Sequence, residues 1–230
     1  MRVVITRPQK SAIRTAERLS KMGHEAIIMP LSYFTYNLSL VRMALKKPYA
    51  AVAITSAEAL CTIPEEISPS LDTIVFAVGN ASAAAAQNHG FKNIFSGTGN
   101  GISLAKEIIK QRDILSPEKP LLYLAGRPRS PGFEETLCQN FIPFTAIDCY
   151  LAHDISYSSK DTERLLAKID VILFYSRENV VRFFALPLPD RIMARFLCLS
   201  AQVASAIPDP YKKDIAVANS PDENALLELL

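Results

Sequence analysis

The stretch AVAITSAEAL, residues 51–60, passes from an apolar run through a serine into a helical pattern. The run Ala51–Thr55 is apolar without alternation, which is typical of a strand covered on both faces of a parallel sheet. Ser56 follows where the helix would begin, and serine is a favoured helix N-cap. The same order returns in VILFYSRENV, residues 171–180, which places Ser56 and Ser176 120 residues apart. The chain therefore contains this strand–helix unit twice.

Two further pairs of segments keep nearly the same spacing. VFAVGNASAAAA (75–86) matches FLCLSAQVASAI (196–207), and GNGISLAKEI (99–108) matches SPDENALLEL (220–229), each 121 residues further on. Chance explains any one of these pairs, but it explains three pairs in the same order less well. The repeat predicts two similar α/β domains.

Apolar runs alternate with helical patterns along most of the chain, which indicates α/β units built on parallel sheets. Strands are predicted at Val3–Thr6, Ala26–Met29, Ala51–Thr55, Ile74–Val78, Asn93–Phe95, Leu121–Leu124, Phe144–Cys149, Val171–Tyr175, Phe196–Leu199 and Ile215–Ala218. Helices are predicted at Ser11–Met22, Ala57–Cys61, Ser82–His89, Ser103–Lys110, Gly132–Asn140, Ser159–Ala167, Glu178–Ala185, Ala201–Ala206 and Pro221–Leu229.

The first strand–helix unit, Val3–Met22, has no counterpart just before Val171, but by pattern it matches residues 121–140. The N-terminal unit is therefore expected to join the C-terminal half, so that the chain crosses between domains twice. Domain 1 is predicted to comprise 1–33 and 152–230, and domain 2 to comprise 37–147. The crossings, 30–37 and 148–154, are extended and contain tyrosine, so we expect them to pair as a two-stranded β-ladder. The expected fold is α/β, with two similar domains whose parallel sheets are flanked by helices, bilobed around a central cleft.

Composition excludes several classes of protein. The chain is 49% hydrophobic and 21% charged with a formal charge of +2, which gives no reason to expect nucleic-acid binding. It has no apolar run of about 18 residues, and MRVVITRPQK at its start does not resemble a signal peptide. Its four cysteines form no C-x-x-C pair, and its three histidines lack metal-ligand spacing. We therefore expect a cytoplasmic protein without a metal site or membrane association.

Ligands of open parallel sheets bind beyond the carboxyl ends of the strands, so the residues at those positions are the candidate site. They are rich in Ser, Gly, Asn and Arg and poor in acids. Helix N-termini, hydroxyls and guanidinium groups all favour anions. For any single serine, N-capping is the better explanation, and each arginine could be a solvated surface residue. As a set they favour an anionic ligand. The candidates are Arg7, Ser56, Asn80, Ser82, Arg127, Arg129, Ser176, Arg177, Ser200 and Gln202.

Motifs for nucleotide cofactors and nucleophilic catalysis are absent from the sequence. There is no G-x-G-x-x-G, no P-loop and no G-x-S-x-G, and GTGNG (97–101) has the wrong spacing. A phenol remains as a proton donor. Tyr150 is the candidate because it lies in a predicted crossing, although a linker tyrosine with a buried ring and a solvated hydroxyl explains it equally well.

In their order, the segments VVITRP, GHEAIIMPL, AVAITSAEAL, VFAVGNASAAAAQNHGF, GISLAKEI, LLYLAGRPR, CYLAHD, VILFYSRENVVRFF and VANSPDENALLEL resemble those of the uroporphyrinogen-III synthase family. The resemblance spans essentially the whole chain. It implies two α/β domains joined by a ladder, no cofactor, and a carbon–oxygen lyase (hydro-lyase type) of porphyrin and heme biosynthesis. The implied reaction closes hydroxymethylbilane to uroporphyrinogen III, with inversion of ring D and loss of water. It also implies that the ladder tyrosine, Tyr150, assists the departure of the hydroxyl group.

The chain departs from the family pattern at several positions. Ser200-Ala201-Gln202 stands where relatives carry glycine, small residues and threonine, so Gln202 would have to replace a hydroxyl contact. Ser82 replaces a usual threonine and keeps the hydroxyl, and CQNFIPF (138–144) lacks a usual glycine. The expected partner is the small-molecule substrate, and the expected state is a monomer. The alternative function is a non-enzymatic two-lobed protein that binds a polycarboxylate or another anion. A nucleotide-dependent enzyme is disfavoured by the missing glycine motif.

Overall fold

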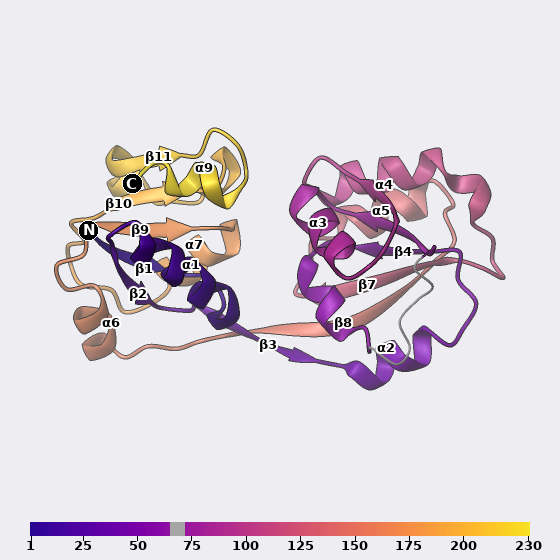
Figure 1. The fold of residues 1–230 in the computed structure, drawn as a ribbon, viewed down its shortest axis with the longest axis horizontal. Coiled ribbons are helices and arrows are strands. Elements are labelled where there is room, and N and C mark those ends of the chain that lie inside the picture. The colour runs from indigo at the N-terminus through magenta and orange to yellow at the C-terminus, as the bar shows by residue number, and fades with distance from the viewer. Residues whose placement is uncertain (65–71) are drawn as a thin grey trace. The chain divides into compact units, whose positions relative to one another are not determined.

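The computed structural model describes residues 1–64 and 72–230, and the chain divides into two compact units (Figure 1). Unit 1 comprises Met1–Tyr33 and His153–Leu230, and unit 2 comprises Phe34–Ala152. The units are defined by their internal packing alone, so the domain boundaries predicted from the sequence stay a prediction.

Unit 1 is built on a five-stranded sheet in the order β11-β10-β9-β1-β2. Each pair of neighbouring strands is parallel. Such a sheet needs cover on both faces, and the apolar runs of the sequence meet that need. Its strands are β1 (Arg2–Ile5), β2 (Glu25–Ile28), β9 (Val171–Phe174), β10 (Arg195–Cys198) and β11 (Ile215–Val217).

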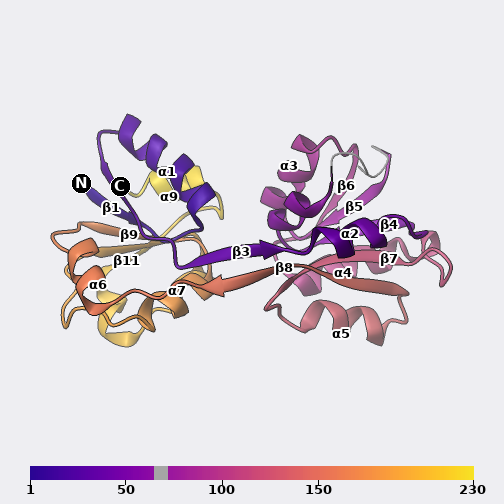
Figure 2. The same cartoon turned by 90° about the horizontal axis from the view of Figure 1, so that it is seen from below.

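Helices cover both faces of this sheet (Figure 2). Val3 and Ile5 pack with α1 (Gln9–Lys21) and α9 (Glu223–Leu227) on one face. Val4 lies in the core of the other face, beneath the helices of the 159–204 region. Those helices are α6 (Ser159–Leu165), α7 (Arg177–Phe184) and α8 (Ala201–Ala204), and η4 (Asp209–Asp214) is a short 3-10 helix before β11. Alternate residues of one apolar strand thus serve two cores.

Unit 2 contains a six-stranded sheet in the order β3-β8-β7-β4-β5-β6. From β8 to β6 the neighbouring strands are parallel. Its strands are β3 (Ser32–Tyr36), β4 (Ala51–Ile54), β5 (Ile74–Ala77), β6 (Asn93–Ser96), β7 (Leu121–Arg127) and β8 (Phe144–Asp154). On one face lie α2 (Leu38–Ala44), the 3-10 helix η1 (Ala57–Thr62) and α3 (Asn80–Asn88). On the other lie α4 (Gly101–Lys110) and α5 (Gly132–Gln139), and η3 (Arg112–Ile114) follows α4.

The two sheets share one strand order, which confirms the repeat predicted from the sequence. The order β11-β10-β9-β1-β2 of unit 1 corresponds to β6-β5-β4-β7-β8 of unit 2. In this correspondence β9 matches β4, and β1 matches β7, as expected from residues 121–140. The first strand of the chain therefore completes the sheet of the C-terminal half.

The predicted ladder between the two crossings is present as β3 and β8, which are neighbours in the sheet. The Asn37 N–H donates to the Cys149 carbonyl, and the Ile155 N–H donates to the Leu31 carbonyl, which is the pattern of antiparallel strands. Helix α2 was not expected from the sequence. Among the described residues, no helix has the length and apolar character that crossing a membrane requires.

Candidate functional site

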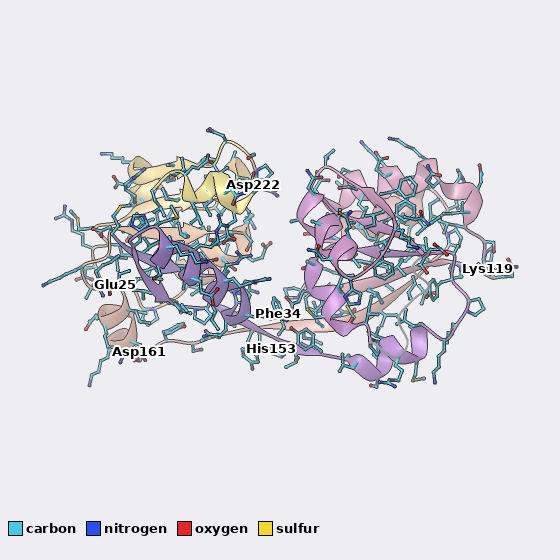
Figure 3. All side chains as sticks on the ribbon, viewed as in Figure 1. Glu25, Phe34, Lys119, His153, Asp161 and Asp222 are labelled. Atoms are coloured by element: carbon cyan, nitrogen blue, oxygen red, sulfur yellow. The ribbon has the colours of Figure 1, made fainter. Side chains whose placement is uncertain are left out.

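The candidate residues follow the carboxyl ends of the strands in both units. Residues labelled in Figure 3 show where the strands of each unit begin and end. Lys119 precedes β7 and Glu25 begins β2, at the amino ends of the parallel strands, whereas Phe34 and Asp222 lie near the carboxyl ends. Arg7 follows β1, Ser56 follows β4, and Arg127 ends β7. The remaining candidates follow β5, β7, β9 and β10 in the same way, as the topology of parallel strands requires.

Tyr150 owes its position to an irregularity between β7 and β8. Ala125 pairs with Asp148, but Gly126 pairs with Tyr150, so Cys149 is an extra residue on β8. The ring of Tyr150 lies directly against Gly126. A Cβ atom at that position would come within 2.1 Å of Cζ and 2.3 Å of the hydroxyl oxygen of Tyr150. Glycine is therefore required at position 126 to make room for the phenol.

Two further groups hold the Tyr150 ring. Phe34 meets it edge-to-face, with ring centroids 5.3 Å apart and an interplanar angle of 82°. Burial raises the pKa of Tyr150 to about 12, although a hydrogen bond with the Ser56 side chain acts in the lowering direction. The phenol consequently stays protonated at neutral pH and can donate a hydrogen bond.

A carboxylate and a second phenol accompany Tyr150. The Tyr36 hydroxyl donates a short hydrogen bond to Glu58 Oε1. Burial and this carboxylate together raise the pKa of Tyr36 well above its ordinary value. Ser56 joins the two halves of the group because its Oγ also accepts from the Glu58 backbone N–H at 3.2 Å. We call Tyr36, Ser56, Glu58 and Tyr150 the phenol–carboxylate cluster.

The arginines after β7 are bound to acids, which corrects the expectation of an edge poor in acids. Arg127 Nε lies 2.5 Å from Asp148 Oδ2, and Arg129 Nε lies 2.5 Å from Glu134 Oε1. Arg129 also donates to the other oxygen of Asp148. Burial tends to raise the pKa of Asp148, but the two arginines hold it below its ordinary value. These arginines are neutralised within unit 2.

A buried tyrosine, Tyr123, packs against Arg129 of this ion-paired group. Tyr123 is 1% exposed, and its hydroxyl lies 2.9 Å from Thr55 Oγ1. The guanidinium of Arg129 lies 5.9 Å from the centroid of the Tyr123 ring, within the range of a cation–π contact. Arg129 is thus packed on the sheet, and its side chain is less exposed than that of Arg127, at 18% against 60%.

Arg7 in unit 1 is likewise paired with an acid. Its Nη1 lies 2.8 Å from Glu223 Oε1, and its guanidinium lies 4.2 Å from the centroid of the Tyr175 ring. Glu223 also accepts from Thr15, from Tyr175 at 3.0 Å and from Arg18 at 3.0 Å. Glu223, the first residue of α9, therefore ties Arg7 of the loop after β1 to α1 and to Tyr175.

The serines after β4, β9 and β10 are N-caps. Besides Ser56, Ser176 Oγ accepts from the Asn179 N–H at 3.2 Å, and Ser200 Oγ accepts from the Val203 N–H at 3.4 Å. Arg177 and Gln202 are exposed in the first turns that follow. Among the described residues, Arg177 forms no ion pair, which distinguishes it from Arg7, Arg127 and Arg129.

The turn after β5 brings two glycines together. A Cβ atom on Gly79 would lie 3.1 Å from Gly99 Cα, so this approach favours glycine. Asn80 is exposed at the start of α3 and accepts from Ser96 Oγ at 3.4 Å. Ser82 is only 6% exposed, so little of its hydroxyl is available to a ligand in this conformation.

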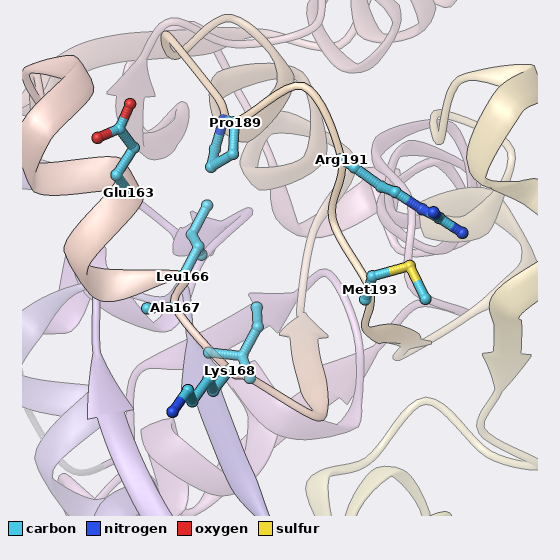
Figure 4. A pocket seen from close by; sticks show the side chains of 8 residues that line it. Glu163, Leu166, Ala167, Lys168, Pro189, Arg191 and Met193 are labelled. Carbon is cyan, nitrogen blue, oxygen red and sulfur yellow. The ribbon is translucent and has the colours of Figure 1, made fainter.

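A hollow of about 400 Å³ in unit 1 lies away from these residues (Figure 4). It is lined by Glu163, Leu166, Ala167, Lys168, Ile169, Pro189, Arg191 and Met193. These residues precede β9 and β10, so the hollow lies at the amino edge of the sheet. It contains none of the predicted site residues.

Sequence reasoning gave no role to the acids and the additional phenols near the carboxyl ends of the strands. Glu58 and Glu223 stand in the first turns of their helices, where acids are common for helix-dipole reasons alone. Asp148 stands two residues before Tyr150. It contacts Arg127 because β7 pairs with β8. The sequence shows where these strands lie along the chain, but not which residue of one pairs with which residue of the other.

Comparison with known proteins gives one family. A family model described as "Uroporphyrinogen-III synthase HemD" matches residues 13–228. No curated protein sequence matches the chain. The structure is similar to a uroporphyrinogen-III synthetase from Helicobacter pylori 26695, with 19% identity, a TM-score of 0.66, and coverage of 100% of this chain and 98% of that chain.

It is also similar to a mutant uroporphyrinogen III synthase from the extremely thermophilic bacterium Thermus thermophilus. There the identity is 14%, the TM-score is 0.63, and 99% of this chain and 96% of that chain are covered. At these identities the structural likeness shows the fold, and the match over residues 13–228 shows the family. The chain belongs to the uroporphyrinogen-III synthase family, whose members are lyases of porphyrin biosynthesis.

Proposed function

We propose that this chain closes hydroxymethylbilane to uroporphyrinogen III at the carboxyl edge of unit 2, with Tyr150 as the hydrogen-bond and proton donor to the departing hydroxyl. The observation that carries the proposal is the packing of Tyr150 against Gly126, beside Ser56 and Phe34. The extra residue in β8, Cys149, and the absence of a side chain at Gly126 in β7 together hold the Tyr150 phenol in one position. Such preorganisation is the usual requirement for a catalytic donor.

The acidity of Tyr150 suits this task. A leaving hydroxide is the conjugate base of water, whose pKa is about 15.7. A phenol whose pKa is about 12 can therefore protonate it as the carbon–oxygen bond breaks, yet keeps its proton at neutral pH beforehand. An acid whose pKa lay well below neutral pH would be ionised at rest and unable to donate.

The proposal assigns substrate carboxylates to the remaining edge residues. Exposed Arg177 and the helix N-termini capped by Ser176 and Ser200 offer donors directly. The other proposed binding residues are Arg7, Ser56, Asn80, Ser82, Arg127, Arg129 and Gln202. Arg7, Arg127 and Arg129 must each exchange a carboxylate of the protein for one of the substrate. We further propose that the protein acts as a cytoplasmic monomer.

The test supplies hydroxymethylbilane and resolves the uroporphyrinogen I and III isomers by chromatography. Spontaneous closure gives isomer I, so we expect isomer III only with the protein present. An isomer III yield equal to that of the protein-free control would reject the proposed reaction.

Tyr150→Phe tests the residue separately from the reaction. It removes one hydroxyl and keeps the ring, so we expect turnover to fall about tenfold to a hundredfold with little change in unfolding temperature. Tyr33→Phe is the matched control, because Tyr33 is a tyrosine of the neighbouring strand β3, 51% exposed and stacked on His153. Equal turnover for the Tyr150 variant and the wild type would remove Tyr150 from the mechanism.

A further inference from the structure

Glu58 differs from the other acids at the carboxyl edge of unit 2. Asp148 and Glu134 are each bound by arginine. Within the described ranges, Glu58 forms no ion pair, and its recorded side-chain partner is the Tyr36 phenol. It is half-buried, with part of its surface open to a ligand. Among the described residues, the carboxylate is therefore oriented by a neutral donor and paired with no cationic side chain.

Such a carboxylate is unexpected beside a substrate that carries many carboxylates, because like charges weaken binding. It becomes useful only if some part of the substrate turns positive during the reaction. An interaction that is absent or repulsive in the ground state and attractive in the transition state accelerates the chemical step. Its signature is an effect on kcat rather than on KM.

We propose that the Glu58 carboxylate is the counter-charge for the cation formed when hydroxymethylbilane loses its hydroxyl, and that Tyr36 holds this carboxylate in place. The inference rests on the proposed function and adds a second catalytic residue to it. Glu58 and Tyr150 are joined through Ser56, which accepts the Glu58 N–H and hydrogen-bonds the Tyr150 side chain. In the proposed reaction, positive charge develops on the carbon whose bond to oxygen Tyr150 helps to break. Because Glu58 lies near Tyr150, its carboxylate is placed beside that carbon.

Atoms and electrons balance in this step. The carbon–oxygen bond breaks with its electron pair going to oxygen, which takes the Tyr150 proton and leaves as water. The nitrogen lone pair of the pyrrole ring forms a double bond toward the exposed carbon, so the ring becomes cationic beside Glu58. The ring D carbon that already carries a bridge attacks this cation, and its older bond to that bridge then breaks, which moves the positive charge to the bridge carbon. The free carbon of ring D next to nitrogen attacks that bridge carbon, which closes the macrocycle with ring D inverted and consumes the cation. The proton that this free carbon loses restores the Tyr150 phenol. No oxidant or reductant is needed.

Tyr36 explains why the carboxylate can be kept at this place. A half-buried charge without partners is costly, and a charge-assisted hydrogen bond offsets part of that cost. An arginine in the same position would offset more but would also neutralise the charge that the cation needs. A phenol holds the oxygen atom and leaves the charge.

The experiment compares Glu58→Gln with Glu178→Gln in the isomer assay. Glu178 is the matched control because it occupies the corresponding place in the repeat, two residues after the cap Ser176, and is exposed. For Glu58→Gln we expect kcat to fall about tenfold to a hundredfold, within or below the effect of removing one charge-stabilising group from an active site. We expect KM to stay equal or fall, because a repulsive charge is gone.

Glu58→Asp keeps the charge and should recover part of kcat, and Tyr36→Phe should lower kcat by less than Glu58→Gln does. Glu178→Gln should match the wild type. A kcat for Glu58→Gln within twofold of wild type would overturn the inference, as would a loss carried by KM alone. Neither result would touch the proposed function, which fails only if the wild-type protein forms no isomer III.

Discussion

Gly126→Ala tests the geometry of the site without changing any polar group. The new Cβ would lie 2.1 Å from Tyr150 Cζ, 2.3 Å from its hydroxyl oxygen and 2.5 Å from Cε2. Carbon atoms pack at about 3.5–4.0 Å, so the ring must retreat by about 1.4 Å or more. β8 is held between β3 and β7, which leaves rotation of the side chain as the available movement.

This displacement of the Tyr150 ring should lower both the stability of the protein and its turnover. Overpacking at a well-packed position costs about 1–3 kcal/mol, so the free energy of unfolding should drop by that amount. A displacement of about 1 Å in a catalytic group can cost about a hundredfold in rate. We therefore expect turnover of Gly126→Ala to be at least as low as that of Tyr150→Phe.

The assay is a double-mutant cycle with Tyr150→Ala, read by chemical denaturation and by isomer III formation. Gly126 is not in the left-handed region, so alanine is free of backbone strain there. Once the ring is gone, Gly126→Ala should cost no stability and should add about 0.4–1 kcal/mol by restricting the unfolded chain. The same destabilisation in both backgrounds would refute the steric account. Gly101→Ala, which crowds Phe133 at 2.9 Å instead, is the control expected to keep turnover.

Three further predictions follow from the charges. Asp148→Asn should lower KM for hydroxymethylbilane by up to about fivefold, because it frees Arg127 from a pair worth about 1 kcal/mol or less, and steady-state kinetics at low salt would show this. The raised pKa of Tyr150 implies stability that is complete below pH 10 and lost as pH rises through about 12, so alkaline denaturation curves should be shallower for Tyr150→Phe. Burial tends to raise the pKa of Glu223, but its hydrogen bonds and the charges of Arg7 and Arg18 hold it below the usual value. Its stabilisation should therefore fade as pH drops below about 4.5, and Glu223→Gln should cost about 1–3 kcal/mol at pH 7, less than a fully buried pair.

Much of the fold could be predicted because it depends on periodicity and spacing. Unalternating apolar runs such as Val171–Phe174 indicated buried parallel strands, and these lie in the centre of the sheet. The spacing of 120–121 residues indicated which strands correspond. The match of 121–140 to the N-terminal unit predicted that the first strand joins the C-terminal half, and in the structure β1 pairs with β9. Helix α2 escaped because its N-cap residue, Asn37, was assigned to the extended crossing 30–37, and the helix is only seven residues long.

The contacts of the site could be predicted only in part. The positions of the serines after the strands follow from topology, and Tyr150 was a candidate because it lies in a predicted crossing. Their partners depend on register, and one extra residue at Cys149 decides that Tyr150 meets Gly126. No periodicity in the sequence reports such an irregularity. The same holds for Asp148, which reaches Arg127 and Arg129 from a neighbouring strand.

The internal acids change how recognition of the substrate should be understood. A formal charge of +2 is modest for a protein whose substrate carries many carboxylates. In this conformation Arg7, Arg127 and Arg129 already bind carboxylates of the chain itself. If the substrate binds at these arginines as proposed, each internal acid preorients a guanidinium and also competes with the substrate for it, so binding is an exchange between carboxylates with a small net gain. With Tyr150 and Glu58 in their proposed roles, weak net gain at each carboxylate leaves binding energy to be realised where charge changes during the reaction, because interactions stronger in the transition state than in the ground state raise kcat.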